Sequence, residues 1–289
     1  MRLQINWDDS NDAFAVKVYT HNIRYAADPQ AEGEEPWSIR KTHVASSILF
    51  NTFNTSSLVL LQEVLHDQLA DILNLLNENT PGDEWIYCGV GRDDGGVKGE
   101  YAPIIFRKSQ FQVVLNRTFW LSETPDIPSK GWDAASIRIV NVSLLIHRQT
   151  ERLAYVLNTH LDDQGKAARE EGAKLINSII DNLEGHDILI LAGDLNSEPD
   201  QEAYPILTKK LRDASKIVAT SNLMKYGNRH TFTGFQSGEK KKTIDYIFVY
   251  SDTSVTSYGV LANIFDDGIY ASDHRPVVAN IVVEKRDSK

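Results

Sequence analysis

The chain has 289 residues, of which 42% are hydrophobic, and a formal net charge of −10. This length is sufficient for a sizeable core and suits one large α/β domain or two small ones. The acidic balance disfavours a protein that grips long nucleic-acid duplexes, which usually carries a basic face, but it is compatible with a short or single-stranded substrate.

The cysteine content and the first residues of the chain bear on its compartment. Cys88 is the only cysteine, so no intrachain disulfide can form, as is common in reducing compartments. The first ten residues lack the apolar segment of a signal peptide, and no run approaches the roughly 18 apolar residues of a membrane span. The sequence therefore predicts a cytoplasmic protein with no membrane span, and it shows no evident protein partner.

Strands and helices alternate along the chain without repeats or long linkers, which predicts a single domain over residues 1–289. Hydrophobic periodicity predicts strands at 16–23, 57–62, 85–90, 102–107, 111–120, 140–147, 152–159, 187–192, 243–250, 258–264 and 276–283. It predicts helices at 38–53, 66–79, 166–182 and 204–211. The segment 121–135 contains two prolines and a glycine, and an irregular loop of this length is often functional.

The buried strand at 187–192 is followed by Gly193, Asp194 and Asn196. Alternation along an extended chain points Asp194 and Asn196 the same way. Two hard oxygen ligands on one side suit magnesium, or could hold a water nucleophile. Taken alone, the pattern fits an ordinary turn equally well, because Gly, Asp and Asn all form turns.

Two histidines lie at the ends of predicted strands. Asp273 and His274 directly precede the last strand, where they could serve as metal ligand and general base. His160 ends another strand and could donate a proton or stabilise phosphate oxygens. Each also fits a structural role, in a capped turn or bonded to a loop.

Three further polar residues lie in or at the ends of apolar strands. Glu63 follows a very apolar strand, at a position that suits a magnesium ligand. Asn22 offers an amide oxygen to a metal or a phosphate, and Asp245 would face the pocket if its neighbours face the core. The alternatives are a surface acid, an in-strand polar residue and a cross-strand pair with a lysine.

Together these positions, in this order, resemble the endonuclease/exonuclease/phosphatase superfamily over nearly the whole chain: Asn22, Glu63, His160, Asp194, Asn196, Asp245, Asp273 and His274. The resemblance implies a four-layer α/β sandwich, in which two mainly antiparallel β-sheets pack face to face with helices outside. It also implies a site at one edge of the sandwich, where loops from both sheets converge.

The same resemblance implies roles for the residues that would hold a metal and water. Glu63 is expected to be the main Mg²⁺ ligand, helped by Asn22 and Asp273, and Mn²⁺ is expected to substitute. Asp194 and Asn196 are expected to orient the attacking water, and they could hold a second metal.

The resemblance also assigns the residues expected to act on the phosphate. His274, paired with Asp273, is the expected base or transition-state partner. His160 is expected to bind the phosphate and to assist the leaving group, and Asp245 is expected to orient one of the histidines. An in-line displacement at phosphorus needs an aligned water, charge neutralisation and a stabilised leaving oxygen, and this set could supply them.

Four other residues are candidates for substrate contacts. Trp120 and Trp132 could stack on a base or a sugar, or could instead wedge a loop onto the core. Arg138 could clamp a phosphate, or be an ordinary ion-paired arginine. Tyr101 lies where members of the superfamily often place a phosphate-contacting tyrosine, with a core tyrosine as the alternative.

The sequence therefore predicts a Mg²⁺-dependent phosphoesterase that hydrolyses a phosphodiester or phosphomonoester through an activated water. Residues 196–204 and 243–249 resemble the deadenylase-like and bacterial-type branches, without a leucine-rich partner-binding segment. One hypothesis is a 3′–5′ exonuclease on single-stranded nucleic acid. The alternative is a phosphatase or phosphodiesterase acting on a nucleotide, sugar phosphate or lipid headgroup. A third is an inactive binding module, which the complete set of polar residues disfavours.

Overall fold

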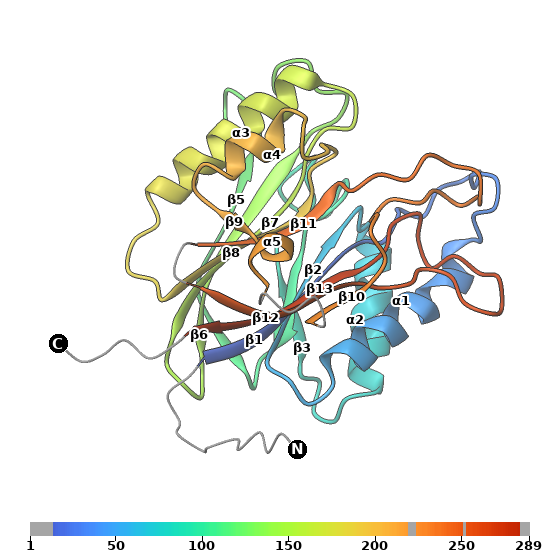
Figure 1. Ribbon diagram of the computed structural model, residues 1–289, viewed down its shortest axis with the longest axis horizontal. Helices are drawn as coiled ribbons and strands as arrows, with labels where there is room; N and C mark the ends of the chain where they lie inside the picture. Colours follow the sequence, from blue (N-terminus) through green and yellow to red (C-terminus); the bar gives the residue numbers. More distant parts are fainter. Residues whose placement is uncertain (1–13, 219–223, 251–252, 284–289) are drawn as a thin grey trace.

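The computed structural model of the protein describes residues 14–218, 224–250 and 253–283. Two β-sheets pack face to face, and helices cover their outer faces. Figure 1 shows one helix pair on each side: α1 (Trp37–Thr52) with α2 (His66–Glu78), and α3 (Lys166–Asp181) with α4 (Ala203–Leu207). The predicted four-layer α/β sandwich is confirmed, and both sheets are mixed.

The larger sheet has seven strands in the order β10-β12-β13-β1-β2-β4-β3. β1 runs parallel to β2 and antiparallel to β13, so the ends of β1 and β2 and the start of β13 meet at one edge. The bounds of the strands are β1 (Phe14–Asn22), β2 (Ser57–Gln62), β3 (Trp85–Cys88), β4 (Ile104–Arg107), β10 (Lys225–Gly227), β12 (Ser254–Val260) and β13 (Val277–Val283).

The smaller sheet has six strands in the order β5-β6-β7-β8-β11-β9. β7 runs parallel to β8, and β11 runs antiparallel to β8, so the ends of β7 and β8 meet the start of β11. The bounds are β5 (Phe111–Trp120), β6 (Ile139–His147), β7 (Leu153–His160), β8 (Ile188–Asp194), β9 (Arg212–Asp213) and β11 (Asp245–Val249), and α5 (Ala214–Ile217) follows β9.

β8 shows why a central strand reads as a continuous apolar run. Ile190 and Ala192 face the core between the sheets, whereas Leu189 and Leu191 pack with Ile176 of α3. Both faces of the strand are therefore covered, and each buried aliphatic side chain contributes roughly 1.5–3 kcal/mol. On the other sheet, α1 and α2 bury their apolar faces against β2 in the same way.

Several element boundaries differ from the predictions. β12 spans Ser254–Val260 rather than 258–264, because pairing with β13 recruits a polar segment with weak alternation. The predicted helix at 204–211 is shorter, as α4 ends at Leu207. The loop at 121–135 is irregular, as predicted. Within the described ranges, no helix is long and apolar enough to cross a membrane.

Candidate active site

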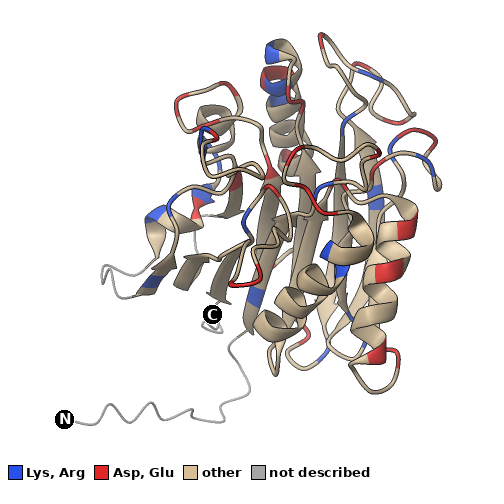
Figure 2. Ribbon diagram, turned by 90° about the vertical axis from the view of Figure 1, so that its right-hand side faces the viewer, with Lys and Arg blue, Asp and Glu red and all other residues tan. Residues whose placement is uncertain are grey.

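The sheet topology brings polar residues from both sheets to one edge of the sandwich. Asn22 ends β1, Glu63 follows β2, and His160 and Asp194 end β7 and β8. Asp245 begins β11, directly opposite Asp194 in the antiparallel register. Figure 2 shows acidic residues on many of the loops at the top of the molecule in that view.

A polar pocket of about 640 Å³ opens at this edge. Seven predicted site residues line it: Glu63, Arg138, His160, Asp194, Asn196, Asp273 and His274. Other lining residues were not singled out from the sequence, among them Arg24, Arg92, Glu100 and Asp163. Arg24 and Asp163 follow predicted site residues within three positions, whereas Arg92 and Glu100 come from a loop between β3 and β4.

Asn22 lies beneath the pocket and joins carboxylates that follow strands of different sheets. Its Nδ2 atom donates to Glu63 Oε1 at 2.9 Å and to Asp194 Oδ2 at 3.0 Å. The other oxygen of Glu63 accepts from the backbone N–H of Tyr25 at 3.2 Å and lies 3.8 Å from Nη1 of Arg24. The carboxylate of Glu63 is thus held at the rim of the sheet.

Asp194 and Asn196 reach the same pocket through a turn. Gly193 has a φ of 141°, and a Cβ there would collide with the carbonyl oxygen of Thr159. Asn196 has a φ of 45°, and its N–H donates to Asp194 Oδ1 at 2.8 Å. The extended alternation used for the prediction ends at Asp194, but the turn keeps both side chains on the pocket side. The amide of Asn196 also lies 3.1 Å from His160 Nε2.

His274 is buried between two carboxylates. Its Nδ1 atom lies 2.9 Å from Asp245 Oδ2, and its Nε2 atom lies 3.7 Å from Asp194 Oδ2. Burial alone would lower the pKa of His274, but Asp245 and Asp194 hold that pKa well above its ordinary value. The expected Asp273–His274 pair is corrected: the histidine ring pairs with Asp245, because β11 brings that residue alongside it.

Asp273 instead accepts from the Ser272 hydroxyl at 3.2 Å. Burial raises its pKa to about 6, and the nearby charge of Glu63 adds to this effect. Carboxylates crowded at this site would be relieved by a cation, and Glu63 and Asp273 offer hard oxygen ligands. Asn22, the third expected ligand, instead turns its Nδ2 toward Glu63 and Asp194, while its Oδ1 accepts from the Arg24 N–H at 3.0 Å. Among the described residues, ligand atoms of Asp194, Asp245 and His274 also lie within 4.8 Å of one another. The donor chemistry therefore fits a divalent metal ion.

His160 faces the pocket from β7. Its Nδ1 atom lies 3.1 Å from Nη1 of Arg138, and its Nε2 atom lies 3.5 Å from Asp194 Oδ2. Burial lowers the pKa of His160 to about 4, and the positive charge of Arg138 adds to this effect. The pKa values of the two histidines are therefore shifted in opposite directions: their surroundings disfavour the charged form of His160 and favour the charged form of His274.

Asp162, which the sequence did not single out, holds Arg138 in place. Arg138 Nε donates to Asp162 Oδ2 at 3.2 Å, and its Nη2 donates to Asp163 at 2.8 Å. The same Asp162 carboxylate accepts four backbone N–H groups, from Ala135, Ser136, Gln164 and Gly165. Its position two residues after His160 is the one sequence signal that could have indicated it.

The three aromatic residues predicted to contact substrate do not line this pocket. Trp120 is only 6% exposed, and its Nε1 donates to the carbonyl oxygen of Arg92 at 2.7 Å. Tyr101 is buried, and its hydroxyl donates to the carbonyl oxygen of Gly96 at 3.0 Å. Trp132 is half-buried in the 121–135 loop, with a φ of 50°. The structure thus places Trp120 and Tyr101 in the wall behind the pocket.

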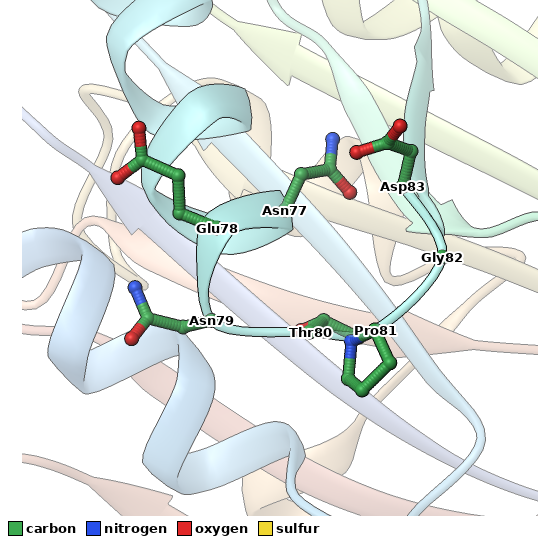
Figure 3. A pocket seen from close by; sticks show the side chains of 7 residues that line it. All are labelled: Asn77, Glu78, Asn79, Thr80, Pro81, Gly82 and Asp83. Atoms are coloured by element: carbon green, nitrogen blue, oxygen red, sulfur yellow. The ribbon is translucent and has the colours of Figure 1, made fainter.

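A second hollow, of about 450 Å³, lies at the turn after α2 (Figure 3). It is lined by one continuous run of seven residues, 77–83, with Pro81 at the tip of the turn. It contains no predicted site residue, no histidine and no basic side chain. It therefore lacks the cationic and imidazole groups that bind and activate a phosphate ester.

The chain is similar to a known family and to solved structures. A model of the endonuclease/exonuclease/phosphatase family matches residues 19–274. An endonuclease/exonuclease/phosphatase from Bacteroides vulgatus is 32% identical, with a TM-score of 0.83 over 94% of this chain and 100% of that one. The mannosyl-6-phosphatase Bt3783 of Bacteroides thetaiotaomicron is also 32% identical, with a TM-score of 0.81 over 92% of this chain and 99% of that one.

Curated relatives come from Acanthamoeba polyphaga mimivirus. The uncharacterized protein R895 is 23% identical over an alignment that covers 94% of this chain and 45% of that protein. The uncharacterized protein L388 is 27% identical over 168 residues, which cover 55% of this chain and 62% of that protein. The chain thus spans about half the length of the curated relatives it matches.

Proposed function

The chain belongs to the endonuclease/exonuclease/phosphatase family, and on that premise we propose that it is a Mg²⁺-dependent phosphomonoesterase acting on a sugar phosphate. Members of the family are phosphoester hydrolases and generally use a divalent metal ion. The observation that carries the proposal is the bounded polar pocket of about 640 Å³, a size typical of small-molecule sites. The similarity of the chain to a mannosyl-6-phosphatase, at 32% sequence identity, also supports a sugar phosphate as the substrate.

The pocket offers little surface for base stacking, which favours a sugar over a nucleic-acid strand. Trp120 and Trp132 do not line it. Each of its two aromatic lining residues has a cation over its ring: Arg24 lies 4.3 Å from the centre of Tyr25, and Lys242 lies 5.6 Å from that of Phe232. Most of the remaining lining consists of hydrogen-bonding groups, which suit hydroxyls.

In the proposed enzyme, Glu63 and Asp273 would hold Mg²⁺ or, in its place, Mn²⁺, and Asn22 would keep Glu63 in position through its hydrogen bond at 2.9 Å. The ion supplies charge neutralisation to the phosphoryl oxygens. Asp194 and Asn196 orient the attacking water, and Asp194 accepts its proton, which fits a pKa raised by burial and by Asp245. The ester P–O bond breaks on the side of phosphorus opposite the water, and the departing sugar oxygen takes up a proton from solvent.

The two histidines divide their roles by charge. His274, held charged between Asp245 and Asp194, binds the phosphoryl oxygens and stabilises their developing charge in the transition state. It therefore acts as the transition-state partner rather than as the base. His160 and Arg138 bind the phosphate from the opposite wall, and uncharged His160 contributes a hydrogen bond.

The experiment that tests this proposal measures Mg²⁺-dependent phosphate release from hexose 6-phosphates, nucleotides and p-nitrophenyl phosphate, with 5′-labelled single-stranded RNA and DNA in parallel. Release from hexose phosphates, blocked by a chelator and with intact strands, is the expected result. Laddering of the labelled strands without phosphate release would replace the proposal with the exonuclease alternative. No turnover of any substrate would favour an inactive binding module.

A further inference from the structure

One wall of the pocket is formed by a tight loop at residues 91–100, here named the clamp loop. Its backbone closes on itself through hydrogen bonds from Gly91 N to Gly96 O at 2.8 Å and from Arg92 N to Glu100 O at 3.1 Å. The carboxylate of Asp94 accepts the N–H of Gly96 at 2.8 Å and that of Lys98 at 3.0 Å. A loop with this many internal hydrogen bonds presents its side chains in a fixed geometry.

Two aromatic residues fasten the clamp loop from behind. The indole N–H of Trp120 donates to the carbonyl oxygen of Arg92 at 2.7 Å, inside the loop. The Tyr101 hydroxyl donates to Gly96 O at 3.0 Å, and its backbone N–H donates to Val64 O at 2.7 Å, next to Glu63. Trp120 and Tyr101 therefore act on the pocket through the loop rather than by direct contact.

The clamp loop turns one arginine and one carboxylate toward the pocket. Arg92 Nη1 donates to Glu100 Oε2 at 2.7 Å, and the two side chains are 14% and 16% exposed. Glu100 Oε2 also lies 3.7 Å from Nδ1 of His160. A carboxylate this close to a phosphate-binding histidine repels a second phosphate but accepts hydrogen bonds from neutral hydroxyls.

In the rest of this wall, too, arginine is paired with carboxylate. Arg138 pairs with Asp163 at 2.8 Å, just as Arg92 pairs with Glu100. Because Arg138 also pairs with Asp162 at 3.2 Å, the two arginines are matched by three carboxylates, whereas a wall that follows a nucleic-acid backbone needs a net positive charge. The wall suits a neutral polyhydroxyl group attached to the phosphate bound beside His160.

We propose that Arg92 and Glu100 form the subsite that recognises the ring hydroxyls of the sugar, and that Trp120 is a positioning residue that holds this pair in place. The inference rests on the proposed function and deepens it. Glu100 accepts hydrogen bonds from two neighbouring hydroxyls, and Arg92 donates to a ring or hydroxyl oxygen. A phosphate ester without hydroxyls gains nothing from the subsite.

The test compares kcat/KM for hexose 6-phosphates and for p-nitrophenyl phosphate, which has no hydroxyls. Glu100→Gln is expected to lower kcat/KM about 10-fold to 100-fold on the best hexose phosphate and less than about threefold on p-nitrophenyl phosphate. Trp120→Phe, which removes the indole N–H, is expected to show the same selectivity with a smaller loss. Glu170→Gln, on the exposed face of α3, is the matched control and should change neither substrate.

If the Glu100→Gln enzyme lost kcat/KM equally on both substrates, or on neither, the proposed subsite would be overturned. Thermal unfolding separates these results from misfolding, and Glu100→Asp, which keeps the charge, should recover part of the hexose activity. A wild-type enzyme that releases phosphate only from p-nitrophenyl phosphate would also overturn the subsite but leave the phosphatase standing. A wild-type enzyme inactive on every phosphomonoester would overturn the proposed function and this inference together.

Discussion

The Nδ1 atom of His274 lies 2.9 Å from Oδ2 of Asp245, and both side chains are buried. The two residues are 29 positions apart and come from different sheets, since Asp245 begins β11 and His274 precedes β13. A carboxylate next to a buried imidazole favours the charged form of the imidazole. In the proposed mechanism this pair keeps His274 positive where the phosphoryl oxygens gain charge.

Replacing Asp245 with asparagine should therefore lower kcat/KM by about 100-fold to 1,000-fold, because an amide no longer stabilises the charge on His274. The measurement is Mg²⁺-dependent hydrolysis of p-nitrophenyl phosphate, with circular dichroism as the check on folding. Asp267→Asn is the matched control, since Asp267 also pairs with a histidine, His43, at 3.5 Å but lies outside the pocket. Full activity in the Asp245→Asn enzyme would refute the role given to the pair.

Removal of the metal should abolish activity and lower stability. We expect Mg²⁺ to raise the melting temperature of the metal-free protein, since at 100 times Kd a ligand stabilises by about 2.7 kcal/mol. Glu63→Gln should raise the Mg²⁺ concentration needed for half-maximal activity by about tenfold or more, and should reduce the thermal shift. A thermal shift unchanged in the Glu63→Gln protein would show that the ion binds elsewhere.

Asp162→Asn should destabilise the protein by about 2–4 kcal/mol, because an amide cannot accept all four backbone N–H groups and leaves Arg138 without its buried counter-charge. Urea denaturation of the two proteins measures this difference in stability, provided that their m-values are equal. These donors hold the pKa of Asp162 below its ordinary value, although burial acts in the opposite direction. The stabilisation is thus present above about pH 4, and the gap between the two proteins should narrow as the pH falls below that value.

His147 should make the protein sensitive to acid. Its ring packs against Phe14 and Phe111, and contacts the hydroxyls of Ser56 and Thr150 at 2.9 Å each. Burial lowers the pKa of His147, so below about pH 6.5 the unfolded chain binds a proton that the folded one does not. Between pH 7 and pH 5, the free energy of unfolding of the wild type should therefore fall more steeply than that of a protein without this histidine.

The comparison for that prediction is His147→Gln, which removes the titrating group. The difference in slope against wild type should approach, at most, about 1.4 kcal/mol per pH unit. His43→Gln, a replacement at a more exposed histidine, serves as the control and should change the slope little. Identical slopes in wild type and the His147→Gln protein would contradict the prediction.

The sequence by itself determined the fold class and most of the elements. Continuous apolar runs such as 188–192 marked central strands, because a strand covered on both faces must be apolar at most positions. The ordered polar residues at strand ends located the pocket, because the ends of neighbouring parallel strands meet at one edge. Boundaries were predicted less well where pairing decides them, as in the polar strand Ser254–Val260.

Only the tertiary structure decided which side chains face one another. Asp245 rather than Asp273 pairs with His274, because β11 and the segment before β13 come together only when the sheets pack. Trp120 and Tyr101 turn toward the clamp loop, where hydrogen bonds that local sequence does not encode hold them. Arg92 and Glu100 reach the pocket because Trp120 and Tyr101 hold the clamp loop in place. Local patterns specify where a strand ends, whereas the packing of distant segments sets the direction of each side chain there.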